Sequence, residues 1–192
     1  MELLKQRILK DGRVPNGDVL IVNSFINHKV DPVLMREIGK DFAARFAGRG
    51  ITKVVTIESS GIAPALFTAI ELGCELVILK KQAASNLIDG TIQTQVFSFT
   101  KNSAYQLTLK RDFISPGEKV LFIDDFLANG EAGLGASELI ERCGATVAGI
   151  GIVITKAFQP GLEKLRKLGY DVYSLAAIKS MEGGKIVFAE DE

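Results

Sequence analysis

The segment VLFIDDFLANGEA, residues 120–132, constrains the fold more than any other part of the sequence. An apolar run ends at two adjacent carboxylates, Asp124 and Asp125, and a short turn of small residues leads into a helical pattern near Glu131. In open α/β folds such a run is a buried strand, and ligands bind beyond its carboxyl end. The N–H groups at the start of the following helix favour a phosphate. The segment therefore predicts a sugar-phosphate site, with an ordinary strand–helix turn as the alternative.

Strand and helix patterns alternate along the rest of the chain. Asp31 and Pro32 mark one helix start, because Asp caps a helix and Pro fits its first position. Apolar spacing predicts strands at residues 53–57, 76–79, 119–123, 146–155, 172–178 and 185–188, and helices at 2–10, 32–46, 62–70, 131–142 and 160–168. The alternation predicts an α/β fold, a parallel sheet flanked by helices on both faces. Because 192 residues suit one domain, we expect a single domain over residues 1–192.

The composition argues against a broad surface for nucleic acid or membrane. Lys plus Arg and Asp plus Glu both number 23, so the formal charges balance. No apolar run approaches the roughly 20 residues that span a bilayer, and the N-terminal MELLKQRILK lacks the apolar core of a signal peptide. Cys74 and Cys143 have no metal or redox spacing and are expected as buried thiols in a reducing cytosol. We therefore expect a cytoplasmic protein that binds neither nucleic acid nor membrane.

A second turn between a strand and a helix lies in VVTIESSGIAPA, residues 54–65. The strand ends at Glu58, and Ser59, Ser60 and Gly61 form a tight turn before the next helix. Successive N–H groups at a helix start favour an anion, and glycine permits a close backbone approach. The alternative is that Ser60 only caps the helix. The pairing with the acids of the first segment favours the anion site.

A long polar segment, residues 82–104, interrupts the alternation. Irregular segments of this length inside compact domains are usually lids or disordered. Residues 95–99 and 105–109 also have the pattern of a surface hairpin. We expect both interpretations to hold, with the hairpin strands forming the stalk of a lid.

Residues 120–132 resemble the phosphoribosyl-pyrophosphate (PRPP) signature of the type I phosphoribosyltransferases, in which an apolar run, two acids and a small-residue turn follow each other. The resemblance implies that Asp124 and Asp125 hold the ribose hydroxyls, directly or through water. It also implies that the turn binds the 5′-phosphate through Ala128, Asn129, Gly130, Glu131 and Ala132. Family members carry a flexible loop where residues 82–104 lie, and this loop covers the site during catalysis.

The turn departs from the family pattern. Asn129 and Ala132 stand where many members have Thr, so hydroxyl contacts are missing, although the Asn129 amide can donate. Glu131 adds a carboxylate near the phosphate and is expected to point away. Ala128 stands where hypoxanthine-type members carry an Asp near the base, so that carboxylate is absent as a general base.

The pyrophosphate of PRPP has its own expected contacts. The family binds it with the loop that matches Ser59, Ser60 and Gly61, often through a strained or cis peptide. A lysine just past the next strand reaches the pyrophosphate in family members, and Lys81 is the expected residue here. Lysine pairs at strand ends are usually only solvated, so Lys81 alone would carry little weight.

The base pocket sets specificity. Lys156 matches the lysine that donates to the exocyclic 6-oxygen in oxopurine transferases, and an ammonium cannot accept a bond from the amino group of adenine. Ala128, in contrast, looks more like the adenine enzymes. VLIVNSFINHKVDP resembles the small N-terminal hood of the bacterial xanthine branch, and TKAFQPG also looks like that branch. The similarity covers nearly the whole chain, so the resemblance implies a hood here as well. In that branch, residues matching Leu20 and Asn27 line the base pocket, and the Asn27 amide suits the 2-oxygen of xanthine.

The resemblance implies a purine-salvage enzyme that transfers the 5-phosphoribosyl group from PRPP to xanthine, giving xanthosine monophosphate and pyrophosphate. Mg²⁺, bound mainly through PRPP and pyrophosphate, is the implied cofactor, and a homodimer is the implied assembly. A guanine or hypoxanthine transferase is the runner-up. A regulator of the same fold that binds PRPP without catalysis is the alternative of another class. Such a protein should carry a basic face or a DNA-binding domain, whereas the charges of this chain balance.

Overall fold

The computed structural model describes residues 1–15, 19–82, 90–98 and 102–190. Within these residues one eight-stranded sheet has the strand order β3-β4-β2-β1-β5-β6-β7-β8. The strands are β1 (Lys53–Ile57), β2 (Glu75–Gln82), β3 (Thr91–Ser98), β4 (Ser103–Lys110), β5 (Lys119–Leu127), β6 (Thr146–Lys156), β7 (Val172–Ser180) and β8 (Val187–Phe188). The central strands β2, β1, β5, β6 and β7 are parallel. The hairpin β3–β4 and strand β8 extend the two edges in antiparallel pairing.

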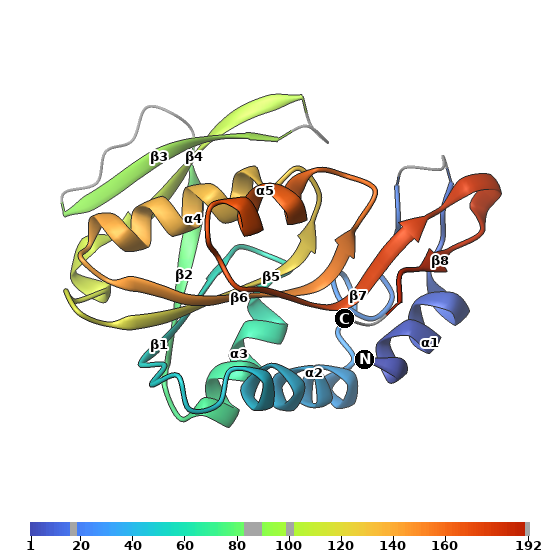
Figure 1. Cartoon of the computed structure of the whole chain (residues 1–192), viewed down its shortest axis with the longest axis horizontal. Helices are drawn as coiled ribbons and strands as arrows, with labels where there is room; N and C mark the ends of the chain where they lie inside the picture. Colours follow the sequence, from blue (N-terminus) through green and yellow to red (C-terminus); the bar gives the residue numbers. More distant parts are fainter. Residues whose placement is uncertain (16–18, 83–89, 99–101, 191–192) are drawn as a thin grey trace.

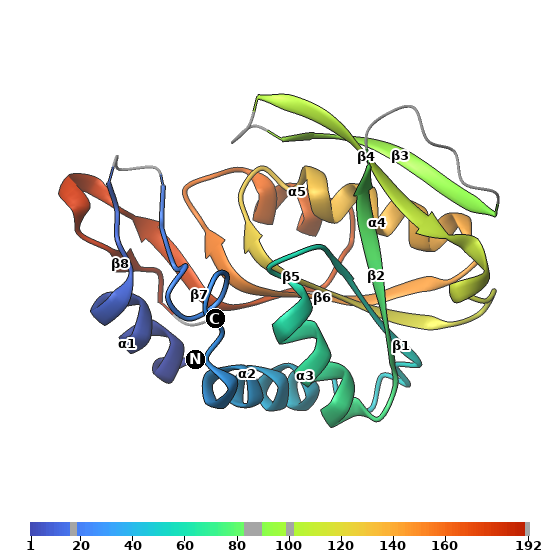
Figure 2. The same cartoon turned by 180° about the vertical axis from the view of Figure 1, so that it is seen from behind.

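Helices cover both faces of the sheet. Helices α2 (Pro32–Arg45) and α3 (Ile62–Leu72) lie on one face, and α4 (Glu131–Arg142) and α5 (Gly161–Lys167) lie on the other (Figures 1 and 2). Helix α1 (Glu2–Asp11) lies beside the β7–β8 edge (Figure 1). Two short 3₁₀ turns, Arg111–Phe113 and Glu182–Gly184, complete the elements. None of the described helices has the length and apolar character that a membrane span requires.

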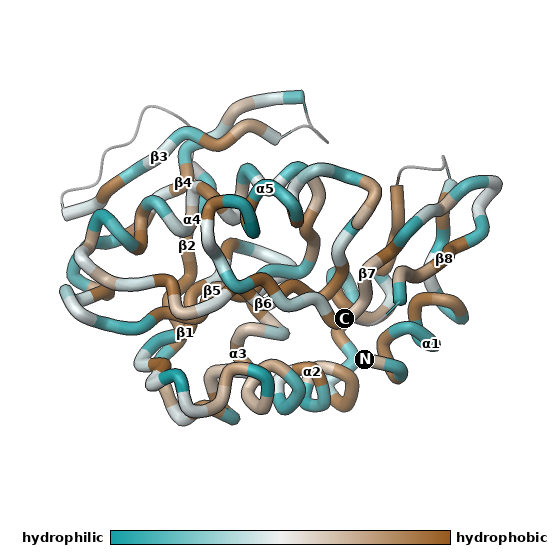
Figure 3. Tube along the Cα trace, viewed as in Figure 1, coloured by the Kyte–Doolittle hydropathy of each residue, from teal (hydrophilic) through white to brown (hydrophobic). Residues whose placement is uncertain are grey.

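The apolar core forms two clusters, one on each side of the sheet. Along β5, Leu121 and Ile123 pack with α2 and α3, whereas Val120 and Phe122 pack with α4 and α5. Because both faces are buried, the central strands are apolar at successive positions, which is typical of parallel sheets. Figure 3 shows this as brown segments in the middle of the sheet. The expected fold class, a parallel sheet with helices on both faces, is confirmed.

Glycines allow two close packings that shape the fold. On β6, a Cβ atom at Gly151 would lie 2.8 Å from the Phe42 ring, so the glycine leaves room for that side chain of α2. On α4, a Cβ atom at Gly135 would lie 2.6 Å from Cγ2 of Val96 on β3. Real Cβ atoms do not come so close, so the hairpin lies against α4 only because residue 135 has no side chain.

Residues 1–15 and 19–30 precede α2, and we call them the hood. Its turn at residues 23–29 is closed by backbone bonds from His28 and Lys29 to the carbonyl of Asn23. Phe25 and Ile26 are buried in the cluster shared with α2. Asp31 then caps α2, accepting hydrogen bonds from the N–H groups of Val33 and Leu34 at 3.0 and 3.1 Å, as its sequence position predicted.

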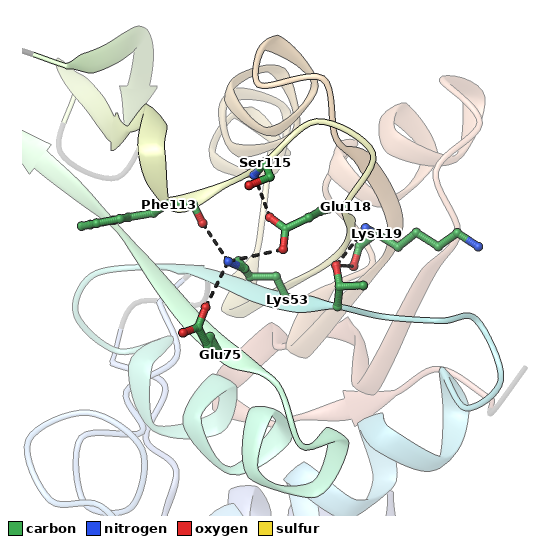
Figure 4. A network of polar contacts seen from close by, with 7 residues as sticks. Lys53, Glu75, Phe113, Ser115, Glu118 and Lys119 are labelled. Atoms are coloured by element: carbon green, nitrogen blue, oxygen red, sulfur yellow. Dashed lines mark hydrogen bonds and ion pairs between the residues drawn. The ribbon is translucent and has the colours of Figure 1, made fainter.

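The amino ends of the central strands are joined by a polar network (Figure 4). The Lys53 ammonium donates to Glu75 at 3.1 Å and to the carbonyl of Phe113 at 3.0 Å, and it pairs with Glu118 at 3.3 Å. Glu118 also accepts from the N–H of Ser115 at 2.8 Å. The network therefore ties β1, β2 and the segment before β5 together.

Several boundaries differ from the sequence expectation. Strand β5 continues to Leu127 instead of ending at residue 123, and β2 continues to Gln82, so both acids and Lys81 lie within strands. The expected strand at 185–188 is reduced to Val187–Phe188, because only this part pairs with β7. The expected hairpin is confirmed as β3 and β4. Residues 83–89 and 99–101 of the expected lid lie outside the described residues.

Candidate active site

A cleft of about 610 Å³ opens at the carboxyl end of the central strands. The hairpin β3–β4 and the hood turn also contribute to its walls. The predicted site residues that line it are Asn27, Ser59, Ser60, Lys81, Asp124, Asp125, Ala128, Asn129, Gly130, Glu131 and Ala132. Segments that are far apart in the sequence therefore meet in one place, at the sheet edge where parallel α/β folds bind ligands.

Asp124 and Asp125 are adjacent residues of β5, the first buried and the second half-buried. Asp124 is only 8% exposed, and its Oδ1 atom accepts the N–H of Asp125 at 3.0 Å. Burial raises the pKa of both carboxyls, and the charge of Asp125 raises the pKa of Asp124 further. The positive charge of Lys81 offsets these effects only in part. Among the described residues, none forms an ion pair with either carboxylate, so the pair is well placed to bind ligand hydroxyls or a cation.

Residues 128–132, the turn predicted to bind the 5′-phosphate, link β5 to α4, and we call them the phosphate loop after that prediction. Gly130 has φ of +87°, a left-handed conformation that favours glycine, and it immediately precedes the helix. The carbonyl of Ala128 accepts the N–H of Gly161 at 2.9 Å, so the start of α5 supports the loop from behind. The carboxylate of Glu131 accepts a hydrogen bond from Lys164 at 2.6 Å. The loop thus presents a helix N-terminus to the cleft, an arrangement that binds anions.

The second loop, residues 58–61, follows β1. The peptide bond between Glu58 and Ser59 is cis. Burial alone would raise the pKa of Glu58, but hydrogen bonds from the Lys80 ammonium at 2.9 Å and the Lys81 N–H at 2.7 Å lower it. Glu58 therefore stays charged and fixes the end of β2 against the loop. Behind the loop, a Cβ atom at Gly61 would overlap Oγ1 of Thr56 and would lie 3.1 Å from Oδ1 of Asp124, so the close packing there requires glycine.

Tyr105 on β4 forms a wall of the cleft opposite these loops. The Lys81 ammonium lies 5.5 Å from the centre of its ring, a cation–π contact. Burial and the nearby charge of Asp124 raise the pKa of Tyr105 to about 12, so its hydroxyl remains protonated at neutral pH. Phe97, Ser98 and Ser103 of the same hairpin also line the cleft.

Three predicted residues do not line this cleft. Leu20 is buried in the hood, Gly61 lies behind its loop, and Lys156 ends β6 at the same edge of the sheet but outside the cleft wall. Sequence reasoning missed several lining residues, namely Glu58, Phe97, Tyr105, Phe126 and Ile152. Glu58 carried a signal, because an acid at the end of a strand faces the same edge as Asp124. The others belong to apolar strand patterns that gave no sign of a site.

Solved structures with the same fold include adenine phosphoribosyltransferases. The enzyme from Giardia lamblia, complexed with 9-deazaadenine, has a TM-score of 0.76 at 22% identity and covers 91% of this chain and 97% of its own. The enzyme from Trypanosoma brucei, in complex with AMP, pyrophosphate and ribose-5-phosphate, has a TM-score of 0.74 at 21% identity, covering 91% and 79%. At this identity the likeness establishes the fold alone.

Sequence relatives are much more similar. The xanthine phosphoribosyltransferase of Agathobacter rectalis is 58% identical over 191 residues, covering all of both chains. The xanthine phosphoribosyltransferase of Bacillus cereus is 51% identical over 192 residues, covering 100% of this chain and 98% of its own. The family profile described as "Phosphoribosyl transferase domain" matches residues 34–188, which include both loops and both acids. The chain therefore belongs to the phosphoribosyltransferase family.

Proposed function

We propose that this protein transfers the 5-phosphoribosyl group from PRPP to N9 of xanthine, releasing pyrophosphate and forming xanthosine 5′-monophosphate. The observation that carries the proposal is the full-length match, at 58% identity, to a xanthine phosphoribosyltransferase. The cleft supports it, because paired carboxylates lie between two loops that each precede a helix N-terminus. One loop is suited to the 5′-phosphate and the other to the pyrophosphate.

Asp124 and Asp125 have the central role in this proposal. They hold the ribose hydroxyls, and their negative charge favours the oxocarbenium-like state that develops at the anomeric carbon. Ser59, Ser60 and Lys81, which line the same cleft, bind the leaving pyrophosphate. The contact of Lys81 with the Tyr105 ring keeps its ammonium near this position.

Mg²⁺ fits the donor set, because carboxylate oxygens are ligands that this ion prefers. In the part of the chain that the structure describes, no group of three or more His, Cys, Asp or Glu side chains is arranged to hold a metal ion. Magnesium usually binds through one or two carboxylates together with substrate phosphates. The ion would therefore be held mainly by PRPP, with Asp124 or Asp125 nearby, and would neutralise the leaving pyrophosphate.

The base is recognised by the hood and by the end of β6. Asn27 lines the cleft and offers an amide for the 2-oxygen of xanthine, and Leu20, buried in the same hood, supports the base pocket. Lys156 donates to the 6-oxygen, which requires its side chain to reach toward the base when the site is occupied. The hairpin β3–β4 is the stalk of the lid that covers the site. We further propose a cytoplasmic homodimer.

A panel of bases tests the proposal directly. With PRPP and Mg²⁺, we expect xanthine to be the best substrate, guanine and hypoxanthine weaker ones, and adenine nearly inactive. A site built around a specific polar partner can discriminate by roughly 10⁴-fold, because its own groups are otherwise left unpaired. Lys156→Met should lose most xanthine transfer while PRPP binding stays nearly unchanged.

Each alternative has a distinct outcome in the same panel. If guanine or hypoxanthine were the best base, the protein would be a guanine or hypoxanthine transferase instead. Adenine as the best base, or full xanthine activity in Lys156→Met, would overturn the assignment of the base site. PRPP binding without transfer to any base would favour a regulator of this fold.

A further inference from the structure

Helix α5 begins in direct contact with the phosphate loop, residues 128–132. The Gly161 N–H donates to the carbonyl of Ala128 at 2.9 Å. A Cβ atom at Gly161 would lie 2.6 Å from the backbone nitrogen of Gly130, closer than real Cβ atoms come. The loop and the start of α5 are therefore packed backbone against backbone, and α5 can influence what the loop binds.

The same helix places a positive charge next to the loop. Lys164, one turn into α5, bonds the carboxylate of Glu131 at 2.6 Å. Glu131 is the first residue of α4 and lines the cleft, so its charge lies where the proposed 5′-phosphate approaches. The negative charges of the Glu131 carboxylate and of a bound phosphate repel each other. A negative side chain in a first helical turn also competes with a bound anion for the positive end of the helix.

We propose that Lys164 is a positioning residue for PRPP: it neutralises Glu131 and holds its carboxylate against α5, which leaves the loop free to accept a phosphate. The inference rests on the proposed function of residues 128–132 as the 5′-phosphate site. It adds a residue from outside the cleft, because Lys164 is not among the lining residues. Lys164 acts through Glu131 and does not need to touch the substrate.

The test compares Lys164→Met with Lys167→Met. Lys167 lies on the same helix and pairs with Glu163 at 2.5 Å, where both side chains are more than 70% exposed and away from the loop. Binding of ribose 5-phosphate and of pyrophosphate is measured separately by calorimetry, and KM and kcat are measured for PRPP and xanthine. Lys164→Met should weaken ribose 5-phosphate binding about fivefold and raise KM for PRPP similarly, as expected for a partly exposed charge. Pyrophosphate binding, KM for xanthine and every value for Lys167→Met should stay unchanged.

A double variant separates charge from packing. Glu131→Gln combined with Lys164→Met removes both charges, so ribose 5-phosphate binding should return close to the wild-type value. The defect of the single variant should also shrink at high salt, where exposed charges are screened. Unchanged ribose 5-phosphate binding in Lys164→Met, or a double variant as weak as the single one, overturns the role of Lys164. A wild-type protein that binds neither ribose 5-phosphate nor PRPP instead overturns the proposed function.

Discussion

The two ends of the parallel strands differ in whether protein groups compensate their charged side chains. At the amino end, Lys53 is 11% exposed and its ammonium is surrounded by Glu75, Glu118 and a backbone carbonyl (Figure 4). At the carboxyl end, Asp124 is buried and Asp125 is half-buried, and the charge of Lys81 offsets the effect of burial on their pKa values only in part. One end satisfies its charges within the protein, whereas the other end does not.

This difference distinguishes the structural network around Lys53 from the candidate binding site at Asp124 and Asp125. Burial would lower the pKa of Lys53, but the carboxylates around it raise the pKa, so the ammonium is stabilised in place. Burial raises the pKa values of both Asp124 and Asp125, and the charge of Asp125 raises the pKa of Asp124 further. Buried charges persist when partners compensate them. Under the proposed function, the compensating partners at the carboxyl end come from the ligand, and acids with perturbed pKa values in a cleft are candidates for such a site.

Replacement of Asp125 by Asn should give the largest effect. The amide keeps the shape but removes a negative charge that favours the transition state, and losing one such contact costs about 3 kcal/mol, or roughly 100-fold in turnover. The measurement is kcat for xanthine at saturating PRPP. Circular dichroism melting is the control and should show an intact fold. Near-normal turnover would show that Asp125 does not contribute to catalysis, and the carboxyl end of the strands would then lack the role proposed for it.

Lys53→Met should affect stability instead of catalysis. The substitution removes the hydrogen bond to the carbonyl of Phe113 and the ion pairs with Glu75 and Glu118. A typical hydrogen bond contributes about 1 kcal/mol to stability. Urea unfolding should show a lower free energy of unfolding, while kcat per folded molecule stays the same. Lys119→Met is a matched control at the same edge, since Lys119 contributes backbone hydrogen bonds to Thr52 there. A loss of turnover without a loss of stability would contradict the structural role.

The smallest effect concerns the pH dependence of stability without ligand. A raised carboxyl pKa means that the folded state holds the proton more tightly than the unfolded chain, so stability falls as pH rises through the folded-state pKa. Asp124→Asn keeps the acceptor for the Asp125 N–H but has no charge to bury. It should therefore melt at or above the wild-type temperature at pH 7. The advantage should disappear below the ordinary carboxyl pKa of about 4; an advantage that grows in acid would show that the buried charge is not its cause.

The parts predicted well from the sequence are those determined by local pattern. The helix over residues 131–142 and the capped start at Asp31 follow from spacing and end residues, and both are confirmed. The meeting of residues 58–61 and Asp124 was also predictable, because carboxyl ends of neighbouring parallel strands share one edge. Residues whose position depends on long-range packing were not predictable. Tyr105 reaches the cleft only because β4 pairs with β2, and Lys164 meets Glu131 only because α5 packs on α4.

The close packing of the hairpin on α4 limits how this enzyme can be redesigned. Gly135 lies in the helix that begins at the phosphate loop, and only its missing side chain admits Val96 of the hairpin. A hairpin transplanted from another family member therefore has to bring a small residue to this point or be accompanied by a change at position 135. Libraries that vary the hairpin and the helix together should retain more active members than libraries that vary either one alone.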